Sequence, residues 1–163
     1  MEHHLTWTKG LFESSYQLFE NGQIKSSLFF DTWKNEARCV GFSGNYLFKT
    51  SGFASPTTQI ISENNEVIGV ITYNSWKSRA TVNMNNGEQF IWTFANAWHS
   101  QWTITDFKEK SNHYRSISGG GNAMSNNDDM VMLLAGLFIK EYYNRIFIFI
   151  IIIVVIIPII TRG

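Results

Sequence analysis

The side chains that could support catalysis are few and scattered along the chain. The histidines are His3, His4, His99 and His113, and Cys39 is the single cysteine. A hydrolase needs a nucleophile beside a base that a third group orients, and the sequence contains no HExxH, GxSxG or His-x-His pattern. His99 lies between two tryptophans in AWHSQW, which is typical of a structural residue in an aromatic loop. We therefore expect no catalytic residues, no metal site and no cofactor.

Phosphate binding is a second kind of chemistry, and the segment NSWKSRA at residues 74–80 is its best candidate. Lys77 and Arg79 are two residues apart, so on a strand their cationic side chains point to the same face. Both could then contact the oxygens of one phosphate, with Trp76 at the lipid interface. A solvated polar face on a hairpin explains the same pattern. Trp76, Lys77 and Arg79 are thus candidate lipid-headgroup residues.

The C-terminal residues Ile146–Ile160, IFIFIIIIVVIIPII, are uninterrupted hydrocarbon apart from a proline. Fifteen helical residues span about 22 Å, which is short of the ~30 Å hydrocarbon core of a bilayer. Tyr142 and Tyr143 would extend the segment as interfacial aromatics, and Arg145 would reach the headgroups. We expect a marginal membrane anchor within 146–163. A packed or strand-like segment on the protein and an incidental extension are the alternatives.

The elements that position these residues are organised around Ser125–Tyr143, SNNDDMVMLLAGLFIKEYY. Ser125 can cap the first turn of a helix, and Asp128 takes the capping-box position three residues later. From Met130 to Ile139 every residue is apolar or small. A helix without a polar stripe is buried on all sides, and this run is too short to cross a bilayer. The rest of the protein must therefore surround it.

The preceding chain has the pattern of a series of β-hairpins. Strand-like segments flank Asn21-Gly22, Glu63–Glu66 and Asn85–Gly87, whose residues are typical of tight turns. Residues 80–84, 89–94 and 101–105 alternate between apolar and polar side chains, so each strand has one buried face. Gly119–Gly121 lacks the Lys-Ser/Thr pair of a phosphate-binding loop and is expected to be a linker.

These patterns predict a mainly β fold, a closed antiparallel barrel of short strands around a central helix. The barrel is expected to occupy residues 16–145, with its helix at Asn127–Tyr143. Lys140 and Glu141 are expected to mark the point where the helix regains water. Residues 1–15 form an N-terminal segment of ambiguous structure, and 146–163 form the apolar tail.

The order of elements resembles the tubby C-terminal-like superfamily, which includes LURP-one-related proteins and phospholipid scramblases. The similarity covers about Tyr16–Arg145: an IGVI strand, a WTITD segment after a Trp-rich stretch, and a terminal LLAGL helix ending in two tyrosines. The resemblance implies a closed barrel around a hydrophobic helix. Because tubby itself binds phosphoinositide headgroups through basic residues on the barrel, it also favours Lys77 and Arg79. The Ile-rich tail departs from the family pattern.

The charge composition reduces the number of function classes to consider. Lys+Arg and Asp+Glu are both 13, and a formal net charge of zero argues against general nucleic-acid binding. We expect a non-enzymatic, membrane-associated domain that binds phospholipid headgroups, with the barrel on the cytoplasmic side as the positive-inside tendency places Arg145. A soluble cytoplasmic scaffold or protein-interaction domain is the alternative, and a scramblase-like lipid transporter is a weaker one. No protein partner is identified.

Overall fold

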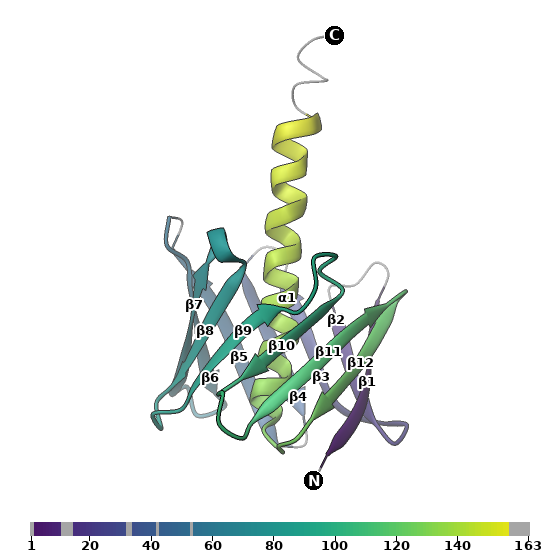
Figure 1. Cartoon of the computed structure of the whole chain (residues 1–163). Helices are drawn as coiled ribbons and strands as arrows, with labels where there is room; N and C mark the ends of the chain where they lie inside the picture. Colours follow the sequence, from purple (N-terminus) through teal and green to yellow (C-terminus); the bar gives the residue numbers. More distant parts are fainter. Residues whose placement is uncertain (1, 11–14, 32–33, 42, 53, 157–163) are drawn as a thin grey trace.

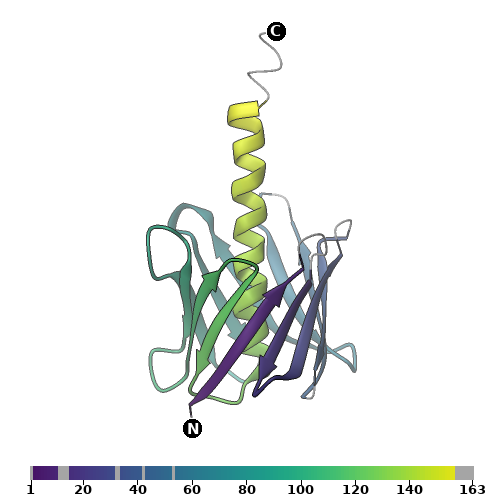
Figure 2. The same cartoon turned by 90° about the vertical axis from the view of Figure 1, so that its right-hand side faces the viewer.

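The protein is a closed antiparallel β-barrel with one helix, α1, running through its interior (Figures 1 and 2). The computed structural model describes residues 2–10, 15–31, 34–41, 43–52 and 54–156. Each strand pairs with the next in sequence, and β12 pairs with β1 to close the barrel. The predicted fold class is confirmed. The strands are β1 (His3–Lys9), β2 (Ser15–Glu20), β3 (Gln23–Asp31), β4 (Glu36–Gly41), β5 (Gly44–Ser51), β6 (Thr57–Ser62), β7 (Val67–Asn74), β8 (Arg79–Met84), β9 (Gln89–Phe94), β10 (Gln101–Thr105), β11 (Ser111–Ile117) and β12 (Gly120–Ser125).

The predicted turns set the register of the hairpins. Asn21 and Gly22 join β2 to β3 with φ of +52° and +77°, the left-handed pair that a two-residue hairpin requires. Asn65 (φ +61°) and Gly87 (φ +88°) hold the left-handed positions in the β6–β7 and β8–β9 turns. All three predicted hairpins are confirmed.

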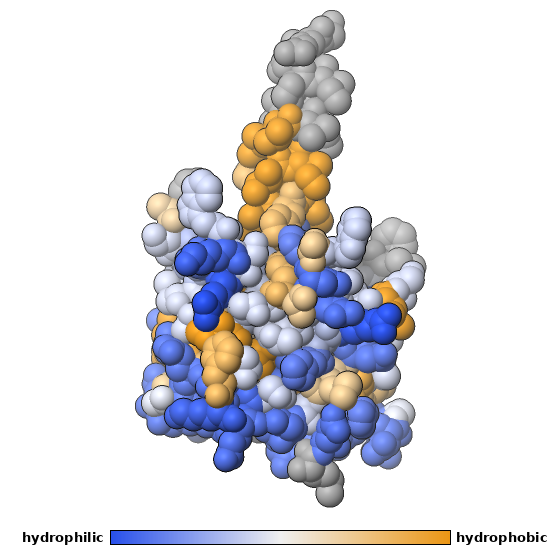
Figure 3. Space-filling view, in the orientation of Figure 1, coloured by the Kyte–Doolittle hydropathy of each residue, from blue (hydrophilic) through white to orange (hydrophobic). Residues whose placement is uncertain are grey.

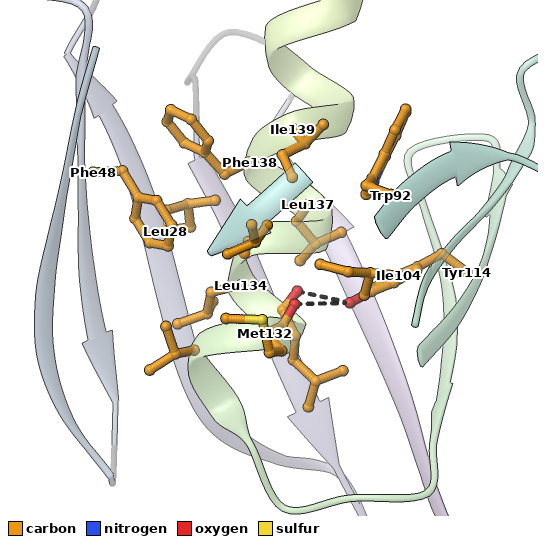
Figure 4. Close-up of a cluster of buried hydrophobic side chains, with 14 of the residues drawn as sticks. Leu28, Phe48, Trp92, Ile104, Tyr114, Met132, Leu134, Leu137, Phe138 and Ile139 are labelled. Carbon is orange, nitrogen blue, oxygen red and sulfur yellow. Dashed lines mark hydrogen bonds between the residues drawn. The ribbon is translucent and has the colours of Figure 1, made fainter. Parts of the chain in front are cut away.

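Helix α1 (Met130–Ile151) fills the barrel. All nine residues from Val131 to Ile139 are buried, as expected for a helix that is apolar on every side. The inward faces of the strands supply the matching apolar residues, with Leu28, Phe48 and Trp92 among the fully buried ones. Figure 4 shows these side chains converging on the helix from opposite walls.

Hydrogen bonds also position the helix in the barrel. The indole nitrogens of Trp92 and Trp102 both donate to the carbonyl oxygen of Gly136, each at 3.1 Å. The Tyr114 hydroxyl donates to the carbonyl oxygen of Leu133 at 2.9 Å. A side chain on Gly136 would overlap the Tyr114 ring. Glycine is therefore required where the barrel wall approaches the helix backbone most closely.

The N-terminal segment is part of the barrel. β1 pairs with β2 on one side and with β12 on the other, with Trp7 opposite Gly121. A Cβ on Gly121 would overlap the Trp7 indole and the Arg115 carbonyl, and a Cβ on Gly120 would overlap the Trp7 backbone. The prediction of a Gly119–Gly121 linker is wrong for Gly120 and Gly121, because glycine lets β1 pack directly against β12.

The helix also begins and ends elsewhere than predicted. Its N-cap is Asp129, whose side chain accepts from Met132 N at 3.2 Å. Ser125 instead ends β12 and donates its hydroxyl to Asn112 at 2.6 Å. At the other end the helix continues to Ile151 and then into the π-helical turn η2 (Ile152–Ile156). The predicted boundaries, Asn127–Tyr143, are therefore wrong at both ends.

Because the strands alternate in direction, the loops fall into two sets. The loops after β1, β3, β5, β7, β9 and β11 lie at the end from which α1 emerges, here called the exit end (Figure 1). The loops after the even-numbered strands lie at the opposite end, here called the far end, where α1 begins. The site described next lies at the exit end.

Candidate functional site

The predicted headgroup residues surround the β7–β8 connection at the exit end. Residues Ser75–Lys77 form a 3₁₀ turn, η1, which Asn74 caps by accepting from Lys77 N at 3.1 Å. Ser78 then adopts a left-handed conformation, with φ +45°. Lys77 and Arg79 are thus on a turn and a strand, and the prediction that they share one strand face is wrong.

A pocket nevertheless brings the two cationic residues together. It has a volume of about 400 Å³ and is lined by Lys77 and Arg79 together with Tyr73, Asn74 and neighbouring residues of β7, β8 and β9. Lys77 is exposed, whereas Arg79 is half-buried. The η1 turn, rather than strand periodicity, is what places both side chains around one hollow.

Two tryptophans project into solvent at the exit end. Trp76 on η1 is 100% exposed, and Trp98 on the β9–β10 loop is 89% exposed. Large aromatic side chains usually contribute to a core or to an interface, and both of these lie in solvent at one end of the barrel. Sequence reasoning identified Trp76 but missed Trp98. Trp98 could have been found because it lies in a loop after an odd-numbered strand, which places it at the same end as Trp76.

The helix leaves the barrel at the same end with its apolar side chains uncovered. Ile148 through Val154 are exposed, at 41–64% of their accessible area. Figure 3 shows this column of hydrophobic surface standing clear of the barrel. The alternative that the tail packs on the protein or forms a strand is wrong for these residues. In the part of the chain that the structure describes, no helix combines the length and apolar character needed to span a bilayer.

The three residues expected at a membrane interface differ in environment. Tyr143 is only 1% exposed, and its hydroxyl donates to the Arg79 carbonyl at 2.6 Å, so its interfacial assignment is wrong. Tyr142 is half-buried and stacks on Tyr73 with ring centroids 3.9 Å apart. Arg145 is half-buried, and its guanidinium lies over the Phe30 ring at 4.8 Å. The helix is still inside the rim of the barrel at these residues.

A buried carboxylate lies where α1 passes the rim. Glu141 accepts from Lys9 Nζ at 2.7 Å and from the Tyr16 hydroxyl at 2.8 Å, and Arg145 Nε lies 3.3 Å from its other oxygen. Burial acts to raise the pKa of Glu141, but the hydrogen bond and charge of Lys9 hold it below its usual value. Glu141 is therefore an ionised structural residue, and the prediction that the helix regains water here is wrong.

Lys140 is buried beside it, and no carboxylate of the described residues forms an ion pair with it. It is 9% exposed and donates to the Asn144 side-chain oxygen at 2.5 Å. Its ammonium lies over the rings of Phe94 and Trp102, at 5.2 and 5.5 Å. Burial lowers the pKa of Lys140 to about 8.

Charge is divided between the two ends. Among the described residues, eight basic and three acidic ones lie toward the exit end, and three basic and nine acidic ones toward the far end, with Arg38 near the middle of β4. The exit-end set is Lys9, Lys34, Lys49, Lys77, Arg79, Arg115, Lys140 and Arg145 against Asp31, Glu36 and Glu141. The far-end set is Lys25, Lys108 and Lys110 against Glu2, Glu20, Glu63, Glu66, Glu88, Asp106, Glu109, Asp128 and Asp129. A formal net charge of zero thus conceals a strong dipole along the barrel axis.

The residues with catalytic chemistry are dispersed. His3 is paired with Glu20 and Asp128, at 2.7 and 2.6 Å, at the far end. Cys39 is 1% exposed in the core, where burial raises its pKa, whereas the His99 ring stacks on Phe94 at 4.0 Å at the exit end. Within the described ranges, His, Cys, Asp and Glu residues form no group of three that could hold a metal ion.

Comparison of the chain with protein-family models, with curated proteins and with solved structures gave no match.

Proposed function

We propose that the protein is a non-enzymatic domain that docks its exit end on an anionic phospholipid surface, with the barrel on the cytoplasmic side. One observation carries the proposal. The uncovered apolar helix, the exposed tryptophans Trp76 and Trp98, and the excess of basic residues all lie at the same end of the barrel. These are the three components of an interfacial membrane contact: an apolar insert, aromatic residues at headgroup level and cationic residues beside anionic lipid.

The length of the uncovered helix is consistent with insertion into one leaflet. The seven exposed residues Ile148–Val154 extend for about 10 Å at 1.5 Å per residue, roughly a third of a ~30 Å hydrocarbon core. The basic residues and tryptophans of the rim would then lie at the level of the headgroups. This arrangement needs no helix that crosses the bilayer.

The pocket beside η1 supplies a headgroup contact within this surface. Lys77 and Arg79 line it, and two cations around one hollow suit the oxygens of a phosphate. Trp76, on the same turn, would enter the interface while the pocket faces a headgroup. The proposed contact thus retains the three residues that the sequence singles out, with a geometry set by the turn.

Vesicle binding by the full chain tests the proposal, and the barrel offers matched controls at its two ends. Lys77 and Lys108 are both exposed lysines, one at the exit end and one at the far end. Each cation near an anionic membrane contributes about 1 kcal/mol. Lys77→Glu changes two charge units, so it should weaken binding to vesicles containing phosphatidylserine by about 30-fold. Lys108→Glu should leave binding unchanged.

A second matched pair of variants tests the contribution of the aromatic side chains to vesicle binding. Trp76→Ala removes a fully exposed ring at the exit end, and Phe107→Ala removes a 72% exposed ring at the far end. On neutral phosphatidylcholine vesicles only the tryptophan substitution should reduce binding. An oriented contact would be refuted if the two lysine variants, or the two aromatic variants, reduced vesicle binding equally.

A protein-interaction scaffold is the second candidate, since the exposed surface of Ile148–Val154 could equally be covered by another protein. If the full chain remains in the supernatant with both vesicle compositions, this candidate replaces the first. Lipid transport is the weaker alternative, and transfer of labelled lipid between leaflets above the protein-free rate would support it.

A further inference from the structure

A second pocket at the exit end lies between α1 and the strands that close the barrel. It has a volume of about 280 Å³, and its wall includes Trp7, Tyr16, Trp102 and Ile117 together with Lys9 and Lys140. Pockets for drug-sized molecules usually measure about 300–1,000 Å³, so this one suits a small ligand. It is separate from the pocket beside η1, with which it shares no residue.

Two lysines, Lys9 and Lys140, line this pocket. Lys140 is buried, and among the described residues no carboxylate lies within ion-pair distance of its ammonium. Lys9 and Arg145 share the single carboxylate of Glu141. Counted over the described residues, Lys9, Lys140 and Arg145 lie around the one carboxylate of Glu141. The excess positive charge on the Lys9 and Lys140 side, which lines the pocket, would be offset by an anionic ligand.

The Trp7 indole provides an independent indication. Its Nε1 is, within the described part of the chain, a buried side-chain polar atom without a hydrogen-bond partner, and Trp7 is only 5% exposed. Nearly all buried donors in native proteins are satisfied by protein, water or ligand. Trp7 and Lys140 both line the pocket. The Lys140 ammonium donates to the Asn144 side-chain oxygen and has further N–H donors for an acceptor on a ligand.

We propose that this pocket binds a small monocarboxylate with an apolar body, whose carboxylate pairs with Lys140 and Lys9 and whose body lies against the aromatic wall. The ammonium groups of Lys140 and Lys9 favour a negatively charged ligand. The rings of Trp7, Tyr16 and Trp102 exclude water from one side of the ligand and favour hydrocarbon over a second polar group. The inference stands independently of membrane docking, because it rests on the pocket alone.

The protonation state of Lys140 makes binding depend on pH. Burial lowers its pKa to about 8, and a bound carboxylate favours the charged amine. Affinity should therefore be highest below pH 8 and fall about tenfold between pH 7 and 9 as the amine loses its proton.

Three groups near Lys140 have shifted pKa values and keep one protonation state over this range: Glu141, Tyr16 and His99. Glu141 stays ionised, and burial raises the pKa of Tyr16 well above this range. Burial lowers the pKa of His99, the nearby histidine, which is neutral throughout. Lys9, on β1, is paired with Glu141.

The test uses the full chain in detergent micelles and three probes measured by saturation-transfer NMR. Hexanoate carries both the charge and the hydrocarbon, acetate only the charge, and hexanol only the hydrocarbon. Saturable binding of hexanoate, at least tenfold tighter than of either partial probe, is expected. Binding equal to that of hexanol would show simple partition into the micelle and would overturn the proposal.

Variants then assign the site. Lys140→Met removes the ammonium and keeps an unbranched side chain one atom shorter, and it should lower hexanoate affinity at least tenfold, whereas Lys108→Met at the far end should not change it. Lys140→Arg should retain binding and lose the decline above pH 8. Unchanged affinity in Lys140→Met would overturn the assignment. The wild-type pH profile tests the same assignment without a variant, because affinity that is flat from pH 7 to 9 excludes Lys140.

Discussion

Gly136 offers a direct test of how the helix is held, because two opposing effects of Gly136→Ala can be estimated. Alanine favours a helix interior by about 1 kcal/mol over glycine. The added Cβ, however, would lie 2.8 Å from Tyr114 Cε2 and nearer still to two further atoms of that side chain. Overpacking of this kind costs about 1–3 kcal/mol.

The Tyr114 ring cannot move away without further loss. It is 3% exposed and stacks on Trp102 with centroids 5.2 Å apart, and its hydroxyl bond to Leu133 contributes about 1 kcal/mol. Adding these costs and subtracting the gain in propensity, we expect Gly136→Ala to lower the free energy of unfolding by about 1–3 kcal/mol. Urea denaturation of the full chain, followed by circular dichroism, measures this value.

A double-mutant cycle with Tyr114→Phe isolates the contact. Removing the hydroxyl takes away the atom nearest to the new Cβ, so Gly136→Ala should cost about 1 kcal/mol less in this background. The reasoning would be refuted if Gly136→Ala stabilised the wild-type protein by the ~1 kcal/mol that propensity alone predicts, since Tyr114 would then not define the space around the helix.

Two further substitutions test the rim and the closure of the barrel. Glu141→Gln should lower the free energy of unfolding at pH 7 by about 3 kcal/mol, because it leaves Lys9 and Arg145 without their carboxylate. The folded-state pKa of Glu141 lies below the usual 4.5, so the stability advantage of the wild type over Glu141→Gln is present above pH 4.5 and should be lost as pH falls through the folded-state pKa. Denaturation of both proteins at pH 7 and at pH 3 measures this advantage. An equal stability difference at the two pH values would contradict the prediction. Gly121→Ala places a Cβ against Trp7 and the Arg115 carbonyl. It should therefore lower Tm by roughly 5–10 °C in a thermal melt. An unchanged Tm would show that β1 has room to move.

The arrangement of a barrel around a helix could be predicted because two strong signals agree. Strands of alternating polarity need a shared interior, and a run from Met130 to Ile139 without a polar face needs to be enclosed. The hairpin turns were equally accessible, since Asn-Gly and its relatives adopt left-handed conformations that other residues resist. These signals are local and do not depend on which distant segments meet.

The predictions were wrong where a partner distant in sequence determines the environment of a residue. Gly121 looks like part of a flexible run until Trp7 is placed against it. Lys140 and Glu141 look like a solvated helix end, but Lys9 from the first strand satisfies the carboxylate of Glu141. Trp98 and Trp76 are 22 residues apart in sequence, and only the alternating direction of the strands puts both at one end of the barrel.

The position of α1 after all the strands has a consequence for how the protein folds. The barrel wall is synthesised before the helix that fills it, and its closing seam joins β1 to β12 across more than a hundred residues. Such long-range pairings form slowly, because the entropy of closing a large loop is lost before the contacts form. Until Met130–Tyr143 is available, the inward faces of the strands have no interior partner. We expect folding to be completed only after α1 has been synthesised, with the nascent strands depending until then on chaperones that shield apolar surface.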